Sequence, residues 1–257
     1  MRCGSSLRSI GSRGRQPLRV GATPVPHAEV LDFVRPALAE QGVDLQIKIF
    51  ESFDAPNDLL VTGFLQANFF QYLPFLEHFN RRTGATLRAV TPVHIEPFGL
   101  YARPGSGIGN AADIPEFAEV ALPADVVNID RALGLLHRLG LLDCPSGVSP
   151  RTLTDIRSNP RELILKEVNS WLLGGIRNDF DLAFLFGNQA MALGLDTGVD
   201  SGEALYCDRD PAYAEYLVTR DELRTDPRIR ALATELAGDR VRTFLLTAYR
   251  GQVTPAF

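Results

Sequence analysis

The alternation of hydrophobic and polar positions at the start of the chain predicts a parallel α/β unit. Residues 18–22 form a short apolar run, and residues 30–38 carry apolar side chains at the spacing of one helix face. Pro36 lies inside that helical pattern, so we expect the helix to be kinked or to begin late. Residues 43–49 alternate between apolar and polar, which is typical of a half-buried strand. Strand, helix and strand in this order predict a parallel sheet with a right-handed crossover.

Further strands and helices follow at similar spacing. Strand patterns recur at residues 87–94, 180–185 and 214–218, and a helical stripe follows Asn128. Alternating strands and helices over 257 residues predict an α/β protein that forms one large domain or two lobes. No stretch reaches the roughly 18 uninterrupted apolar residues that a transmembrane helix needs.

Residues 66–76 combine side chains for packing with side chains for hydrogen bonding. The segment holds four aromatic and three amide residues within eleven positions. A cleft for a small organic molecule needs apolar surface together with a few orienting polar groups, and this segment supplies both. The alternative is a purely structural role, as a buried strand end followed by an aromatic-rich helix.

A second candidate site lies where the helix after residue 127 begins. Asn128 is a good N-cap residue, and Gly140 is placed to end the helix. Arg131 then projects from the first turn, where free backbone N–H groups and the helix dipole favour an anion. A ligand carboxylate there gains a two-pronged contact with the guanidinium group. The alternative is a solvated pair between Arg131 and Asp125 or Asp130.

Composition and charge narrow the classes of function. A hydrophobic fraction of 45% and a charged fraction of 22% are ordinary for a globular protein. The net charge of −5 argues against nucleic acid as a partner, because phosphate binding favours a basic face. The cysteines and histidines are too scattered for a disulfide scaffold or for metal-site spacing, so we expect free thiols, no metal site and no cofactor. They are Cys3, Cys144, Cys207, His27, His78, His94 and His137.

The sequence lacks the common motifs of catalysis. Neither a G-x-S-x-G elbow nor a phosphate loop ending in G-K-[ST] occurs. The glycine-rich residues 105–109 lack the lysine of such a loop and are interpreted as a flexible crossover. We therefore expect a binding protein. The alternatives are an enzyme or a cytosolic ligand sensor on the same fold.

Several ordered motifs resemble those of one family. They are Pro-Asn-Asp at residues 56–58, Gln-Ala-Asn at residues 66–68, and Phe-Gln-Tyr-Leu-Pro-Phe-Leu at residues 70–76. With matching segments over residues 17–257, the chain resembles the NlpA/MetQ family of substrate-binding lipoproteins, which deliver methionine to ABC importers. The resemblance implies a monomer with the two-lobed periplasmic-binding-protein fold of type II and a mixed sheet in each lobe. It also implies a permease and an ATPase as partners.

The resemblance further implies how the chain is divided between the lobes. Residues 1–16, rich in Arg, Ser and Gly, are expected to form a disordered tail. Residues 17–101 and 206–257 are expected to form lobe one, and residues 102–205 lobe two. Glycine and proline cluster near both expected crossings, as in hinge segments. An amino acid or amino-acid-like ligand is then expected between the lobes, near the carboxyl ends of strands.

Five site residues follow from positions that match the family. Asn128 and Arg131 match residues that hold the amino-acid backbone of the ligand. Phe70, Tyr72 and Phe75 match the aromatic wall around its side chain. Tyr72 stands where the family usually has histidine, but it keeps a ring and a hydrogen-bonding tip.

Two further positions depart from the family pattern. Glu96 replaces an aromatic pocket residue, and Phe186 replaces an asparagine that helps to hold the ligand's amino group, for which Asn188 is a substitute. A buried carboxylate needs a donor, so Glu96 predicts a ligand other than methionine, with an amine, guanidinium or amide at its far end. The alternative is that Glu96 lies exposed at a strand end.

The start of the chain leaves two expectations about location. The motif Cys-Gly-Ser-Ser at residues 3–6 resembles the start of a mature lipoprotein, but only two residues precede it, which is too short for an apolar export segment. With a start further upstream, we expect a periplasmic or cell-surface protein with a lipid anchor. If Met1 is the true start, we expect a cytoplasmic one.

Overall fold

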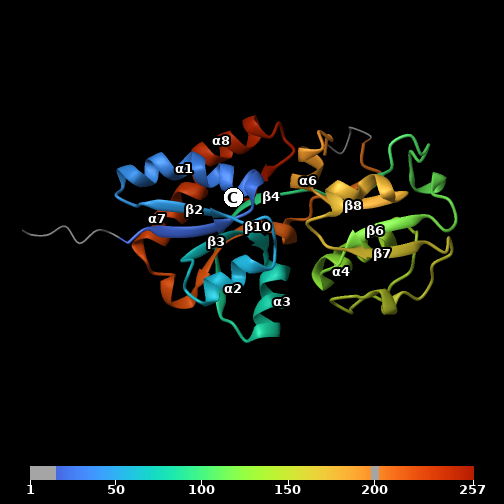
Figure 1. Ribbon diagram of the computed structural model, residues 1–257, viewed down its shortest axis with the longest axis horizontal. Helices are drawn as coiled ribbons and strands as arrows, with labels where there is room; N and C mark the ends of the chain where they lie inside the picture. Colours follow the sequence, from blue (N-terminus) through green and yellow to red (C-terminus); the bar gives the residue numbers. More distant parts are fainter. Residues whose placement is uncertain (1–15, 198–202) are drawn as a thin grey trace, which may run out of the picture.

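Two lobes lie side by side in the computed structural model, which describes residues 16–197 and 203–257 (Figure 1). Each lobe is built around its own mixed sheet, so the protein has the two-lobed α/β fold that the sequence predicts. Residues 1–15 of the expected tail, with Cys3, lie outside the described residues.

Lobe one contains the larger sheet. Its strands are β1 (Leu18–Ala22), β2 (Leu45–Ile49), β3 (Ala67–Tyr72), β4 (Leu87–Ile95), β10 (Ala214–Arg220) and β11 (Thr254–Pro255). Their order across the sheet is β11-β4-β10-β3-β1-β2. The neighbours of β1 run parallel to it, as the strand–helix–strand pattern predicts, whereas β10 runs antiparallel to β3 and β4.

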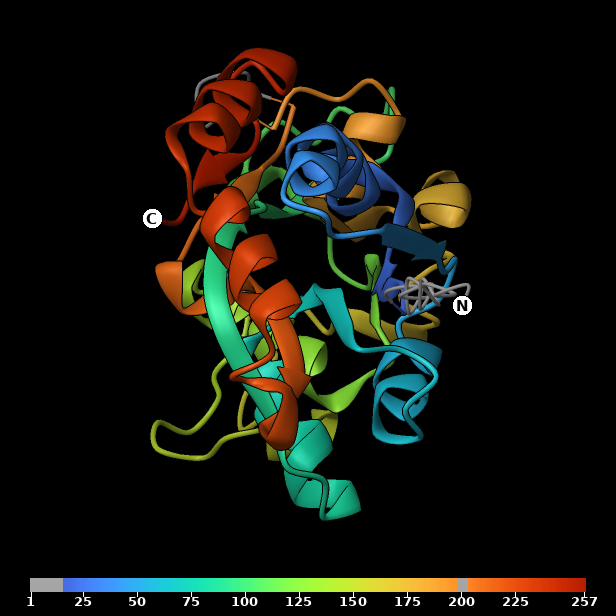
Figure 2. The ribbon, with the colours of Figure 1, turned by 90° about the vertical axis from the view of Figure 1, so that its left-hand side faces the viewer.

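Helices cover both faces of this sheet (Figures 1 and 2). One face is packed by α1 (Glu29–Glu40), α7 (Pro227–Leu236) and α8 (Asp239–Ala248), and the other by α2 (Ala55–Val61) and α3 (Leu73–Thr83). A separate apolar core lies under each set of helices. Helix α1 already starts at residue 29 and continues through Pro36, so it does not begin late.

Lobe two contains the smaller sheet. Its strands are β5 (Phe98–Ala102), β6 (Glu119–Pro123), β7 (Ile164–Val168), β8 (Leu182–Phe186) and β9 (Tyr206–Asp208), in the order β7-β6-β8-β5-β9. Its helices are α4 (Val126–Arg138), α5 (Leu173–Ile176) and α6 (Gly187–Ala192). Helix α4 packs against β6, while α5 and α6 contact β8, and together they enclose one apolar core.

The sheets place the crossings between lobes a few residues away from the expected positions. Phe98 pairs with both Phe186 and Asp208, so β5 and β9 belong to the second sheet although both were expected in lobe one. The first crossing therefore precedes residue 98, and the second follows residue 208. The glycine-rich residues 105–109, expected as a crossover, instead follow β5 within lobe two, where Gly105 and Gly107 adopt positive φ.

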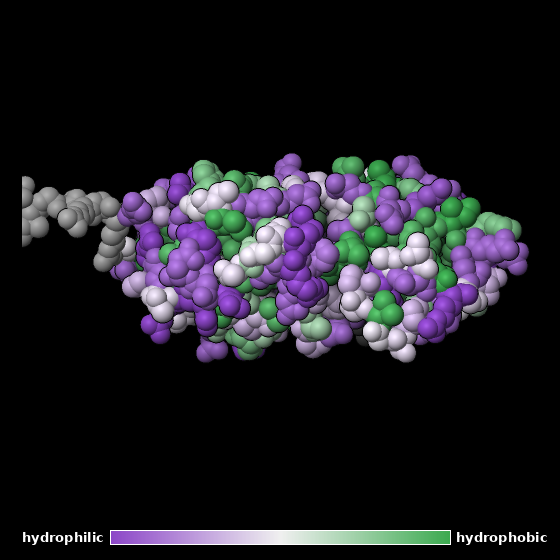
Figure 3. Space-filling view, turned by 90° about the horizontal axis from the view of Figure 1, so that it is seen from below, coloured by the Kyte–Doolittle hydropathy of each residue, from purple (hydrophilic) through white to green (hydrophobic). Residues whose placement is uncertain are grey.

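The outer surface mixes polar and apolar residues. On the face seen in Figure 3, hydrophobic residues form separate patches among hydrophilic ones. Within residues 16–197 and 203–257, no helix combines the length and the apolar character needed to cross a membrane.

Candidate functional site

A cavity lies between the two lobes, and seven of the eight predicted site residues line it. The atom-free space is about 380 Å³, including the part open to solvent. Arg131 is the predicted residue that is not on its wall. The lining residues are His27, Phe53, Phe70, Gln71, Tyr72, Phe75, Glu96, Asn128, Phe186, Asn188 and Glu215.

The aromatic wall comes from the end of β3 and the start of α3. The ring of Phe75 meets those of Phe70 and Tyr72 edge to face, with centroids 6.0 and 6.2 Å apart. Phe69 is fully buried in the core of lobe one. The segment is therefore both a strand end followed by a helix and part of the cavity wall, so the two interpretations of the sequence are compatible.

An amide network supports this wall from inside lobe one. The Gln71 side chain donates to Asn57 Oδ1 at 2.6 Å and to Asn68 Oδ1 at 2.9 Å, and it accepts from Asn57 Nδ2 at 2.9 Å. Gln71 thus holds two buried side chains and also lines the cavity.

Asn128 connects the lobes at the start of α4. The N-cap of this helix is Asp125, whose Oδ1 accepts from the backbone N–H of Asn128, so the expectation that Asn128 itself is the N-cap is wrong. The Asn128 amide donates to both carboxylate oxygens of Asp125 and accepts from the hydroxyl of Tyr72 in the other lobe. Gly140 follows the end of the helix with φ +69°, which agrees with its predicted role.

Arg131 lies next to the cavity, among aromatic rings. Its guanidinium carbon is 3.8 Å from the centre of the Tyr213 ring, 4.7 Å from that of Phe98 and 5.7 Å from that of Tyr72. The residue is only 4% exposed, and its Nε donates to Asp208 Oδ2 at 3.3 Å. Its Nη2 is buried without a hydrogen-bond partner among the described residues, which makes it the free donor of this region.

Two expectations about Arg131 are wrong. Because α4 already begins at Val126, Arg131 lies in its second turn, beyond the free backbone N–H groups of the first. Its carboxylate partner is Asp208 on β9, rather than Asp125 or Asp130. Arg131 pairs with Asp208 because β9 belongs to the second sheet, which brings Asp208 next to α4.

Glu96 is buried on the cavity wall, with an exposure of 8%, so the alternative of an exposed strand end is wrong. Its Oε1 is 3.1 Å from His94 Nε2, and its Oε2 accepts from the backbone N–H of Asn188 at 2.9 Å. Burial opposes ionisation, but these hydrogen bonds and the neighbouring histidines outweigh it and lower the Glu96 pKa. Glu96 therefore obtains its donors from the protein.

Glu215 and His27 complete this part of the cavity wall, and sequence reasoning missed both. Burial, together with the charge of Glu96, raises the Glu215 pKa to about 8, and its Oε2 has no hydrogen-bond partner among the described residues. Burial lowers the His27 pKa to about 4, although Glu96 acts in the opposite direction. At neutral pH, Glu215 is thus largely protonated and His27 neutral. The sequence feature that could have indicated Glu215 is its charge at the start of the otherwise apolar strand 214–218.

Lobe two closes the cavity with the turn from β8 to α6. The Phe186 ring contacts those of Phe53 and Phe98, with centroids 5.6 and 5.1 Å apart. Asn188 meets Glu96 through its backbone N–H, while its side-chain oxygen accepts from the backbone of Gln189. Cys144 and Cys207 are free thiols, as expected.

Comparisons with known proteins agree with this geometry. The sequence profile of the NlpA lipoprotein family matches residues 18–257. The chain is 35% identical to the membrane lipoprotein TpN32 of Treponema pallidum over 239 residues, covering 92% of this chain and 87% of that protein. It is 30% identical to the methionine-binding lipoprotein MetQ of Bacillus subtilis over 258 residues, covering 98% and 92%.

A solved structure extends the comparison to a bound state. A nutrient-binding protein from Burkholderia cenocepacia, bound to methionine, superimposes with a TM-score of 0.86 at 26% identity, covering 93% of this chain and all of that one. The chain therefore belongs to the NlpA lipoprotein family, whose members here are solute-binding proteins and not enzymes.

Proposed function

We propose that the protein is the solute-binding component of an ABC importer and that it holds an amino acid, or an amino-acid-like molecule, in the interlobe cavity. The observation that carries this proposal is the cavity itself, where aromatic and polar residues from both lobes line a common space, as in small-molecule sites. The similarity to a protein named as methionine-binding and to one solved with methionine supports the same class of ligand.

We place the ligand's α-carboxylate at the Arg131 end of the cavity. The free Nη2 of Arg131 offers a donor there, and a charge-assisted hydrogen bond to a carboxylate is stronger than a neutral one. The ligand side chain then lies against the rings of Phe70, Phe75 and Phe186. Such an arrangement recognises the common backbone of amino acids by charge and the variable side chain by apolar contact.

Methionine stays among the candidate ligands. The prediction of a ligand with a donor at its far end assumed that Glu96 lacks a partner. His94 and the backbone of Asn188 supply Glu96 with donors, so this reason for excluding methionine no longer holds. The identity of the amino acid is a matter for a binding screen.

The location and partners follow from this role. An importer component works outside the cytoplasm with a permease and an ATPase, and we propose a lipid-anchored position there. A cytosolic ligand sensor with the same cavity is the second candidate. Fractionation of the native organism separates the two, because the first predicts membrane-associated protein and the second predicts soluble cytoplasmic protein.

The experiment that tests the ligand class is a thermal-shift screen of the twenty amino acids, followed by calorimetry on those that stabilise the protein. We expect saturable binding of at least one amino acid with one site per chain. The matched variant is Phe186→Asp, which puts an unpartnered charge against the ligand side chain and should abolish the shift. If no amino acid shifts the melting temperature of the parent protein, the proposed ligand class is wrong.

A further inference from the structure

Four ionisable side chains meet at the lobe-one end of the cavity, and we call His27, His94, Glu96 and Glu215 the His–Glu cluster. His27 lies in the turn Pro24–Ala28 that follows β1, and Glu96 directly follows β4. His94 and Glu215 stand opposite each other in the antiparallel pair of β4 and β10, so their side chains share one face of the sheet. The pairing of strands thus brings together residues that lie far apart in the sequence.

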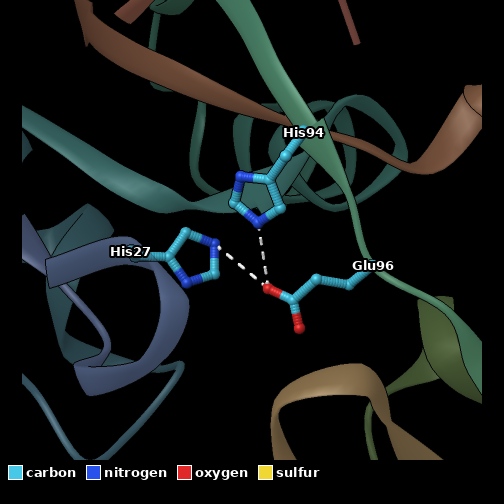
Figure 4. A group of neighbouring side chains, drawn as sticks. All are labelled: His27, His94 and Glu96. Atoms are coloured by element: carbon cyan, nitrogen blue, oxygen red, sulfur yellow. Dashed lines mark hydrogen bonds and ion pairs between the residues drawn. The ribbon is translucent and has the colours of Figure 1, made fainter. Parts of the chain in front are cut away.

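The cluster has the dimensions of a coordination site. The three ligand atoms of His27, His94 and Glu96 lie within 4.8 Å of one another, and Figure 4 shows the three side chains pointing into a common space. Oε1 of Glu96 is 3.1 Å from His94 Nε2 and 3.6 Å from His27 Nε2. Neighbouring ligands of a tetrahedral ion with bonds of about 2.0–2.2 Å are about 3.3–3.6 Å apart.

Three buried atoms of the cluster lack hydrogen bonds among the described residues: Nε2 of His27, Nδ1 of His94 and Oε2 of Glu215. Of these, Nε2 of His27 and Oε2 of Glu215 lie only 3.7 Å apart. The two residues are 3% and 7% exposed, so solvent does not compensate them. Buried polar atoms of this kind are costly, and a pair of them that faces one point suggests an absent partner.

The surroundings orient the first histidine for coordination. Nδ1 of His27 is 2.7 Å from Thr23 Oγ1, and a proton held there leaves the Nε2 lone pair facing the cluster. The ring of Phe69 packs edge-on against both histidines, with centroids 4.7 Å from His27 and 5.3 Å from His94. A polar support on the far ring nitrogen and an apolar shell are usual around protein-bound metal ions.

We propose that the His–Glu cluster binds a divalent transition-metal ion of the zinc type. Two imidazole nitrogens and two carboxylates are a ligand set that suits zinc, whereas magnesium and calcium prefer oxygen ligands throughout. The ion supplies the partner that Oε2 of Glu215 and Nε2 of His27 lack. This site is separate from the carboxylate-binding role proposed for Arg131.

The proposal is tested by metal binding in the absence of amino acids. The protein is dialysed against a chelator, and Zn²⁺ is then titrated in competition with a chromophoric chelator. We expect one tightly bound ion per chain and no competition from Mg²⁺ in excess. Replacement by Co²⁺ should give the intense visible absorption of a four-coordinate site.

Variants assign the ion to the cluster. His94→Gln and Glu215→Gln each remove one ligand and should weaken Zn²⁺ binding by more than about 100-fold, since even the loss of a supporting hydrogen bond costs 10–100-fold. The matched control is His137→Gln, which removes a histidine from an exposed pair with Asp143 and should leave the affinity unchanged. Circular dichroism and melting temperature in chelator confirm that each variant is folded.

Two results would overturn the proposal. One is a parent protein that binds no Zn²⁺ in competition with the chelator. The other is a Zn²⁺ affinity that is the same in His94→Gln and in Glu215→Gln as in the parent protein. That result would place the ion elsewhere. Neither result affects the amino-acid proposal, because that is tested separately by the thermal-shift screen and calorimetry.

Discussion

Two groups of ionisable side chains, which we call the two ends of the site, are assembled from different parts of the chain. At one end, Arg131 extends from α4 of lobe two and meets Tyr72 and Tyr213 across the gap between lobes. At the other end, the His–Glu cluster comes from segments around β1, β4 and β10 of lobe one. The Arg131 end thus depends on how the lobes meet, whereas the ligand atoms of the cluster belong to one lobe.

Because of this difference, the two ends are suited to different roles. An end built across the lobes couples ligand binding to their closure, as in hinge-type binding proteins. A cluster held within one sheet keeps its geometry whether or not the other lobe is near. The hydrogen bond from the Asn188 backbone to Glu96 links it to lobe two. We therefore expect variants at the two ends to have separable effects.

The largest effect is expected from Arg131→Gln. Removing one partner of a buried charged contact costs about 2–5 kcal/mol, which is roughly 30-fold to several-thousand-fold in amino-acid affinity. Calorimetry with the best amino acid from the screen measures this loss. The control is Arg138→Gln on the same helix, because Arg138 is 50% exposed and lies 3.9 Å from the same Asp208. Comparable losses in both variants would show that helix charge, rather than a specific contact, governs affinity.

A smaller effect is expected from Tyr72→Phe. The variant keeps the ring on the cavity wall but removes the hydroxyl that donates to Asn128 across the lobes. A neutral hydrogen bond contributes about 0.5–1.5 kcal/mol, so amino-acid affinity should fall about two- to twelve-fold. Tyr216→Phe is the control, because that ring packs against the α2–α3 core instead. An unchanged affinity for Tyr72→Phe would mean that this contact between the lobes does not contribute to binding.

The smallest effect on amino-acid binding is expected from His94→Gln. His94 is fully buried and is not among the residues that line the cavity, so amino-acid affinity should change by less than about threefold. The same variant should lose Zn²⁺, whereas Arg131→Gln should keep it. Both ligands are titrated into all three proteins. A single variant that lost both ligands while remaining folded would contradict the separation of the two ends.

The sequence predicts local structure well because local patterns report local geometry. The alternation at residues 43–49 and the apolar run at residues 18–22 predict β2 and β1 in parallel, and the amide-rich segment before Pro74 predicts the aromatic wall. Asp125 and Asn128 are both good cap residues three positions apart, so only the observed end of β6 decides between them.

The rest depends on contacts between distant segments. Glu215 reaches His94 only because β10 pairs with β4, and Asp208 reaches Arg131 only because β9 joins the second sheet. These pairs are separated by 121 residues (215 − 94) and 77 residues (208 − 131), and neither the spacing nor the composition of the chain encodes such pairing. For the same reason, the sequence could not predict the partners of Glu96 or the role that depends on them.

The most direct test of the central claim is a double-mutant cycle between Arg131 and the ligand's carboxylate. Calorimetry compares the best-binding amino acid with its carboxamide, which lacks the charge, on the parent protein and on Arg131→Gln. If the carboxylate lies on Arg131, the amide should bind the parent much more weakly, while the variant should bind both ligands with similar, weak affinity. The same penalty for the amide in both proteins would contradict the account, because it would place the carboxylate away from Arg131.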